Sequence, residues 1–91
     1  MYQYNFPRTR FVGTNSINDQ IKHLASEIEE LKQADSWEEK LLETLDVIHS
    51  AETLLRRFER NWPGCVEHGM LDVLAKNHKR GYYRREAEEN V

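Results

Sequence analysis

Apolar residues recur every three or four positions along most of this 91-residue chain, a spacing that favours α-helices over β-strands. The first series consists of five residues on one helix face: Ile17, Ile21, Leu24, Ile28 and Leu31. Asn15 or Ser16 is a suitable N-cap for this helix. Residues 34–36 interrupt the series, so we expect the helix to end there.

A second and longer helix is predicted over about residues 37–61. Ser36 followed by Glu39 resembles a capping box at its start, and Pro63 cannot continue the helix beyond its end. Two apolar stripes lie beside one another on this helix: Leu41, Leu45, Ile48 and Leu55 on one, and Val47, Ala51, Leu54 and Phe58 on the other. So wide an apolar arc indicates contacts on two sides, and therefore a partner beyond the first helix.

A third helix is predicted from about residue 66 to residue 78, and Gly81 breaks the chain after it. These elements predict an all-α fold: an antiparallel helical hairpin plus a third helix, which completes a helical bundle by oligomerisation. We divide the chain into an extended N-terminal arm (1–13), an all-α domain (14–80) and a charged C-terminal tail (81–91). Aromatic residues alternate along the arm and are expected to pack onto the domain: Tyr2, Tyr4 and Phe6.

The composition limits both the core and the location of the protein. Leu, Ile, Val and Phe together supply 21 of the 91 residues, which is enough for a folded core but only a thin one. Cys65 is the single cysteine, which excludes a disulfide within the chain and a multi-cysteine zinc site. No apolar run approaches the ~20 residues that cross a bilayer, and the first residues lack the apolar segment of a signal peptide. We therefore expect a cytoplasmic protein with no membrane partner.

The formal net charge of −3 conceals two oppositely charged halves. Residues 14–46 hold nine acids and three bases, whereas residues 56–85 hold eight bases and three acids. The acidic half is suited to a cation and the basic half to anions, although the two halves could also simply attract one another. Glu52 falls on an apolar stripe of the second helix, where it could pair with a base such as Arg56 or face a site, and we favour the pairing.

Two pairs of carboxylates have a spacing that points to a metal site. Each pair is three residues apart and so lies on one helix face: Glu27 with Glu30 on the first helix, and Glu43 with Asp46 on the second. In an antiparallel hairpin the end of the first helix lies beside the start of the second, so all four carboxylates can converge. Repulsion destabilises such a group unless a cation neutralises it, and oxygen-ligated Mg²⁺ is the natural candidate. A solvated acidic face is the alternative, because a chain with 16 acids contains several such pairs by chance.

The order of these motifs resembles a known family. EIEE at residues 27–30, followed after 12 residues by ETLD at residues 43–46, is similar to the ExxE…ExxD signature of MazG-like nucleoside triphosphate pyrophosphohydrolases, an all-α superfamily. KNHKRG at residues 76–81 resembles the KN..RG segment of its short, often phage-associated, members. The matches together extend over residues 23–83, and their combination in this order is more specific than the acidic motif alone.

The resemblance implies a Mg²⁺-dependent enzyme, with Mn²⁺ as a substitute metal, that cleaves a nucleoside triphosphate between its α and β phosphates. The products are a nucleoside monophosphate and pyrophosphate. Carried over to this chain, the metal ligands are Glu27, Glu30, Glu43 and Asp46. Glu27 is then the candidate catalytic residue, which orients or deprotonates the attacking water.

The resemblance also assigns residues to the substrate. The phosphate-binding residues are Lys76, Asn77, Lys79 and Arg80, whose cations and amide suit phosphate oxygens. Aromatic side chains that could stack on the base are Trp37, Tyr82 and His23, although Trp37 could instead pack against the interhelical turn. The family further implies a homodimer or homotetramer, in which a neighbouring subunit can supply phosphate ligands.

Two other functions fit the same residues. A helical dimer without enzymatic activity could bind nucleic acid through Lys76–Arg85, whose basic and aromatic side chains can contact phosphates and stack on bases. A metal-free scaffold or regulator could use the apolar arc of the second helix. We favour the enzyme, and we expect nucleic acid not to be a partner because the chain as a whole is acidic.

Overall fold

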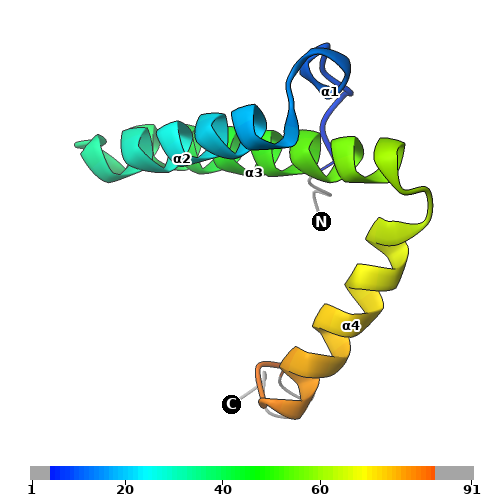
Figure 1. Cartoon of the computed structure of the whole chain (residues 1–91). Helices are drawn as coiled ribbons and strands as arrows, with labels where there is room; N and C mark the ends of the chain where they lie inside the picture. Colours follow the sequence, from blue (N-terminus) through cyan, green and yellow to red (C-terminus); the bar gives the residue numbers. More distant parts are fainter. Residues whose placement is uncertain (1–4, 84–91) are drawn as a thin grey trace.

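The computed structural model describes residues 5–83, and within this range the chain forms helices joined by short connections (Figure 1). The helices are α1 (Phe11–Thr14), α2 (Ile17–Gln33), α3 (Trp37–Asn61) and α4 (Cys65–Lys79). Residues 5–83 contain no strand, which confirms the predicted all-α fold class. Tyr2, Tyr4 and residues 84–91 of the predicted C-terminal tail lie outside the described residues.

Helices α2 and α3 pack side by side as an antiparallel hairpin, as the sequence predicts (Figure 1). The Ser16 hydroxyl caps α2 by accepting a hydrogen bond from the Asp19 N–H at 3.0 Å. The Ser36 hydroxyl caps α3 in the same way, with the Glu39 N–H as donor at 3.1 Å. The Glu39 carboxylate accepts from the Asp35 N–H at 3.2 Å, one residue earlier than in a capping box. These caps fix a short connection, so the last turns of α2 face the first turns of α3.

Helix α4 leaves the hairpin at an elbow after α3 (Figure 1). Pro63 prevents α3 from continuing, and Gly64 has φ = 88°, a left-handed conformation that glycine adopts without strain. The bounds of α4 lie within one residue of the predicted 66–78, which confirms the third predicted helix. No residue of α4 is buried, because the helix projects away from the hairpin.

The core of one chain is thin, as the composition predicts. Val12 is the one apolar residue among those described that is buried, at 1% exposure, whereas three polar residues are also buried: Gln20, Ser50 and Thr53. Large apolar side chains remain exposed along α4, namely Met70, Leu71, Val73 and Leu74. Completion of the bundle by oligomerisation therefore stays a prediction. None of the helices within residues 5–83 is long and apolar enough to cross a membrane.

The N-terminal segment differs from its prediction. The sequence predicts an extended arm up to residue 13, but Phe11–Thr14 form the helical turn α1, closed by a 2.9 Å hydrogen bond from the Asn15 N–H to the Phe11 carbonyl. One turn is too short to produce a helical period in the sequence. Phe6 packs onto the domain as expected, with its ring stacked on the His49 ring at a centroid distance of 4.6 Å.

Candidate metal centre

Three carboxylates meet where the end of α2 lies beside the start of α3. Glu27 and Glu30 come from α2 and Glu43 from α3, and one oxygen of each lies within 4.8 Å of the others. We call these three residues the acidic cluster. Ligand oxygens on opposite sides of Mg²⁺ are about 4.2 Å apart, so only small side-chain movements separate this arrangement from a coordination shell.

Two oxygens of the acidic cluster are buried without a hydrogen-bond partner, Glu27 Oε2 and Glu43 Oε2. The Glu27 side chain as a whole is 15% exposed. Buried polar atoms in proteins are almost always paired, so an unpaired buried carboxylate oxygen is suited to a cation. Glu30 is exposed, like many acidic side chains that hold no metal. The fit to a hard cation such as Mg²⁺ therefore depends on the two buried oxygens.

The raised pKa values of the half-buried Glu27 and Glu43 carboxyl groups indicate that the acidic cluster disfavours its own charge. Burial is the main cause of the raised pKa of the Glu27 carboxyl, and the negative charges of Glu30 and Asp46 raise it further. Burial, followed by the charges of Glu30 and Asp46, also raises the pKa of the Glu43 carboxyl. A cation bound at the cluster would oppose these shifts, because it stabilises the ionised carboxylates.

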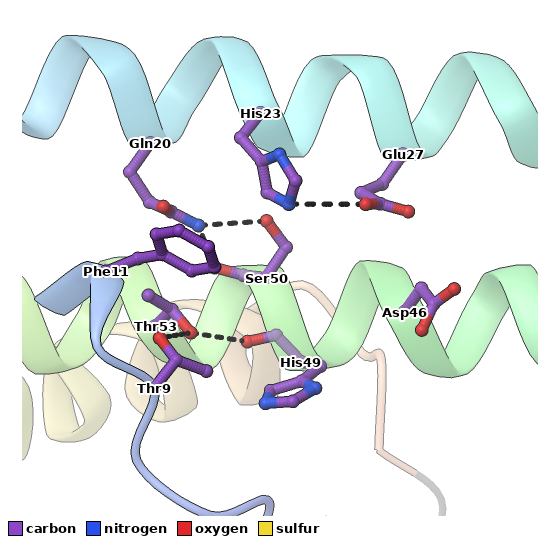
Figure 2. A pocket seen from close by; sticks show the side chains of 9 residues that line it. All are labelled: Thr9, Phe11, Gln20, His23, Glu27, Asp46, His49, Ser50 and Thr53. Carbon is purple, nitrogen blue, oxygen red and sulfur yellow. Dashed lines mark hydrogen bonds and ion pairs between the residues drawn. The ribbon is translucent and has the colours of Figure 1, made fainter. Parts of the chain in front are cut away.

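His23 fixes the orientation of Glu27. Its Nε2 lies 3.2 Å from Glu27 Oε1, one helical turn away on α2 (Figure 2). The charge of His23 lowers the pKa of the Glu27 carboxyl and so acts against burial. Glu27 thus has one oxygen held by a histidine and the other, Oε2, without a partner.

Asp46 lies beside the acidic cluster rather than within it. It comes from α3 and faces Glu27 across the interhelical space in Figure 2. Both residues line one cavity. Of the four carboxylates that the sequence selects as metal ligands, the structure brings three within ligand distance of one another and places the fourth at the edge of this cavity.

The cavity has a volume of about 220 Å³ and lies between α2, α3 and the N-terminal segment (Figure 2). Aromatic, hydroxyl, amide and carboxylate side chains line it: Thr9, Phe11, Gln20, His23, Glu27, Asp46, His49, Ser50 and Thr53. The rings of Phe11 and His23 have centroids 6.2 Å apart. The cavity therefore combines ring faces and hydrogen-bonding groups next to the carboxylates.

Buried polar groups form the wall of the cavity away from the acidic cluster. Gln20 is 2% exposed, and its side-chain amide donates to the Ser50 carbonyl at 3.1 Å and to the Ser50 hydroxyl at 3.0 Å. The Gln20 Oε1 accepts a hydrogen bond from the Asn15 side-chain amide at 2.9 Å. The Thr53 hydroxyl donates to the His49 carbonyl at 3.1 Å. These bonds hold the wall in one arrangement.

Sequence reasoning missed most of these cavity residues. A signal existed for two of them, because polar residues occupy core-facing positions: Gln20 stands between Ile17 and Leu24 on the first apolar stripe, and Ser50 stands on the second stripe of α3. No such signal existed for Thr9, because its position depends on the path of the N-terminal segment.

The predicted phosphate-binding residues lie at the end of α4: Lys76, Asn77, Lys79 and Arg80. The three cations are exposed, and Asn77 is half-buried. In Figure 1 the end of α4 lies well away from the hairpin. Within one chain, the structure does not bring these residues to the acidic cluster.

The aromatic residues selected for base stacking also lie apart from the cavity, with one exception. Trp37 is 71% exposed at the first residue of α3, and Tyr82 is exposed beyond the end of α4. Neither lines the cavity, whereas His23 does. Phe11, which the sequence did not select, is the second ring at this site.

Fold and site together define the class of protein: a small all-α protein with a helical hairpin and an acidic cluster at the closed end of that hairpin. Comparisons with models of known protein families, with curated proteins and with solved structures found no match to this chain. The chain is therefore assigned to no family, and its resemblance to the MazG-like enzymes stays a hypothesis.

Proposed function

We propose that this protein is a Mg²⁺-dependent nucleoside triphosphate pyrophosphohydrolase, which hydrolyses a (d)NTP to a (d)NMP and pyrophosphate. The observation that carries the proposal is the acidic cluster: three carboxylates from two helices lie within ligand distance, and two of them have a buried, unpaired oxygen. The adjoining cavity supports the proposal because it offers ring faces and hydrogen-bonding groups next to the acidic cluster.

In this proposal Glu27, Glu30 and Glu43 hold Mg²⁺, or Mn²⁺ in its place, and Asp46 contributes to the negative charge of the site. A bound divalent cation neutralises phosphate oxygens and lowers the pKa of a coordinated water. Glu27 Oε2 would hold the cation, and Oε1, which lies 3.2 Å from His23 Nε2, would orient the attacking water and accept its proton.

The cavity is suited to the nucleoside end of the substrate. Its volume of about 220 Å³ is below the ~300–1,000 Å³ of pockets for drug-sized ligands, so it accommodates one ring system and leaves the phosphates outside. Phe11 and His23 offer ring faces for stacking, and Ser50 and Thr53 offer hydroxyl groups. Glu27 at the other end of the cavity belongs to the acidic cluster, which the phosphates would then meet.

A second copy of the chain supplies the phosphate-binding residues in this proposal. The basic residues at the end of α4 are remote from the hairpin of their own chain, and the apolar side chains of α4 are exposed (Figure 1). A helix of 15 residues is marginal in water without packing against something. A homodimer or homotetramer would cover α4 and could place Lys76, Lys79 and Arg80 of one copy beside the acidic cluster of another.

Release of pyrophosphate tests the function. Purified protein with Mg²⁺ and a panel of NTPs and dNTPs should release pyrophosphate, and Glu43→Gln should lose at least about 99% of this activity, because a metal-ligand oxygen is replaced by a neutral amide. Glu38→Gln, an exposed carboxylate on the same helix, is the matched control and should keep full activity.

Two outcomes would contradict the proposal. Absence of pyrophosphate release, together with a melting temperature that Mg²⁺ does not raise, would favour the metal-free scaffold. Salt-sensitive binding to single-stranded oligonucleotides that is lost in Arg80→Ala and kept in Glu43→Gln would favour the nucleic-acid-binding dimer.

A further inference from the structure

Residues 5–14, which we call the strap, run across α3 and are held there by charged side chains. Glu52 Oε1 accepts a hydrogen bond from the Phe6 N–H at 2.7 Å, and the Arg56 guanidinium donates to the Phe6 carbonyl at 2.5 Å. Glu52 and Arg56 were expected to pair with each other, but they bind the two sides of one strap residue instead. Arg57 holds the other end of the strap by donating to the Val12 carbonyl at 3.0 Å.

Hydrogen bonds and side-chain packing together fix the position of the strap on α3. The hydrogen bonds of Glu52 and Arg56 go to backbone atoms and hold the strap against the helix, whereas the side chains of Phe6 and Val12 set its register. The Phe6 ring stacks on His49, and the buried Val12 side chain anchors the far end. A shift by one residue would displace both of these side chains, because side chains of successive residues point in different directions.

The strap also completes the cavity. Its Thr9 hydroxyl lies 3.3 Å from the Thr53 hydroxyl of α3, and its Phe11 ring lies beside His23 of α2 (Figure 2). Both strap residues line the cavity, as does His49, whose ring stacks against the strap. Glu52 and Arg56 therefore hold in place the segment whose side chains face the cavity.

We propose that the strap is the specificity element of the cavity: Thr9 and Phe11 discriminate among nucleoside bases, and Glu52 and Arg56 are positioning residues that keep them in place. The identity of the ligand as a nucleoside rests on the proposed function. The Phe11 ring provides a stacking face for the base. The Thr53 hydroxyl gives its proton to the His49 carbonyl, so the Thr9 hydroxyl donates to Thr53 and can accept a hydrogen bond from the edge of the base. Glu52 and Arg56 act only through the strap.

Nucleoside binding without Mg²⁺ tests the strap separately from catalysis. Adenosine, guanosine, cytidine, uridine and thymidine are titrated into the full chain, with the ring protons of Phe11 and His49 followed by NMR. The wild type should prefer one base by at least about tenfold, which corresponds to ~1.4 kcal/mol. Glu52→Ala should weaken binding of that base about tenfold and reduce the preference, whereas Glu52→Gln, which keeps a carbonyl acceptor for the Phe6 N–H, should restore both.

Two further variants make the result decisive. Asp72→Asn, an exposed carboxylate on α4, is the matched control and should bind like the wild type. Thr9→Val keeps the backbone contacts of the strap, so it should change the base preference without detaching the strap from α3. This variant therefore tests the specificity role of the strap even if Glu52→Ala fails to fold. An unchanged preference in Thr9→Val, or a wild type that binds no nucleoside or all five equally, would overturn the inference.

The same measurements separate this inference from the proposed function. Selective nucleoside binding whose preference changes in Thr9→Val, without any release of pyrophosphate from the matching triphosphate, would refute the enzyme and uphold the strap. Release of pyrophosphate with an unaltered base preference in both Glu52→Ala and Thr9→Val would uphold the enzyme and refute the strap.

Discussion

Glu27 and Glu43 occupy positions where an ionised carboxylate is unfavourable in the absence of a cation. Each has a buried oxygen without a partner, and each faces the negative charges of Glu30 and Asp46. An isolated protein would normally avoid such an arrangement, because removal of charge from water costs free energy and repulsion adds to that cost. The arrangement is consistent with a site that gains its stability from a ligand.

The stability of the metal-free protein should depend on pH in a definite direction. The pKa values of Glu27 and Glu43 are raised in the folded state, so the folded protein keeps protons that the unfolded chain has already released. Their contribution to stability is therefore present below the ordinary carboxyl pKa and is lost as pH rises through the raised values. Melting temperatures measured by circular dichroism in EDTA should show this loss as pH rises above the ordinary carboxyl pKa of about 4.3.

A matched pair of variants isolates this effect from other carboxylates. Glu43→Gln removes one of the two titrating groups and weakens the repulsion on the other, so its melting temperature should fall less over the same pH range. Glu38→Gln, which is exposed, should follow the wild type. Equal slopes for the wild type and Glu43→Gln would contradict the role of the acidic cluster in this pH dependence.

Local sequence features account for the elements and for part of the site. The period of the apolar residues and the two serine caps are properties of short segments, and they predicted α2, α3 and α4 closely. The spacing of Glu27 and Glu30, combined with an antiparallel hairpin, was enough to place them beside Glu43. The contact between Gln20 and Ser50 could not be predicted, because it depends on how each helix is rotated about its axis.

The buried amide of Gln20 should be a major contributor to the packing of the hairpin. Gln20→Ala leaves the Asn15 amide without its acceptor and opens space against Ser50. Loss of a buried hydrogen-bonding group costs ~1–3 kcal/mol, and each kcal/mol lowers the melting temperature of a domain this size by about 4–8 °C. Thermal and urea unfolding should show a decrease of this size.

Gln33→Ala is the control for this prediction, since Gln33 is on the same helix but exposed, with one long 3.4 Å contact to Glu29. It should change the unfolding free energy by less than ~0.5 kcal/mol. A Gln20→Ala variant as stable as Gln33→Ala would show that the network at the cavity wall does not stabilise the hairpin.

For the whole molecule, the direction in which α4 leaves the hairpin was beyond sequence reasoning. The elbow at Gly64 was visible as a break, but the angle across it depends on packing that a single sequence pattern does not record. The position of the strap could not be predicted from the sequence for a related reason. Its contacts join residues more than 40 positions apart, such as Phe6 with Glu52 and Val12 with Arg57.

Complementation between two inactive variants should test whether copies of the chain share a site. Arg80→Ala removes a proposed phosphate contact and Glu43→Gln a proposed metal ligand, so each alone should release little pyrophosphate. Mixed after brief unfolding and refolding, they should regain part of the activity, because some mixed oligomers combine an intact acidic cluster with an intact Arg80. Sedimentation should show a dimer or tetramer.

The complementation experiment is conclusive only when mixed oligomers of the two variants have been detected. If sedimentation or mass spectrometry shows mixed oligomers and the activity stays absent, the sharing of a site between copies is wrong. A fully active Arg80→Ala variant would equally remove the basic segment of α4 from the proposed reaction.

The short connection between α2 and α3 has a consequence for the order in which the chain folds. Three residues separate the two helices, so the loop-closure entropy of the hairpin is small and its contacts are local in sequence. The strap must close a much longer loop, since Phe6 and Glu52 are 46 residues apart. We therefore expect the acidic cluster to assemble with the hairpin before the strap closes the cavity.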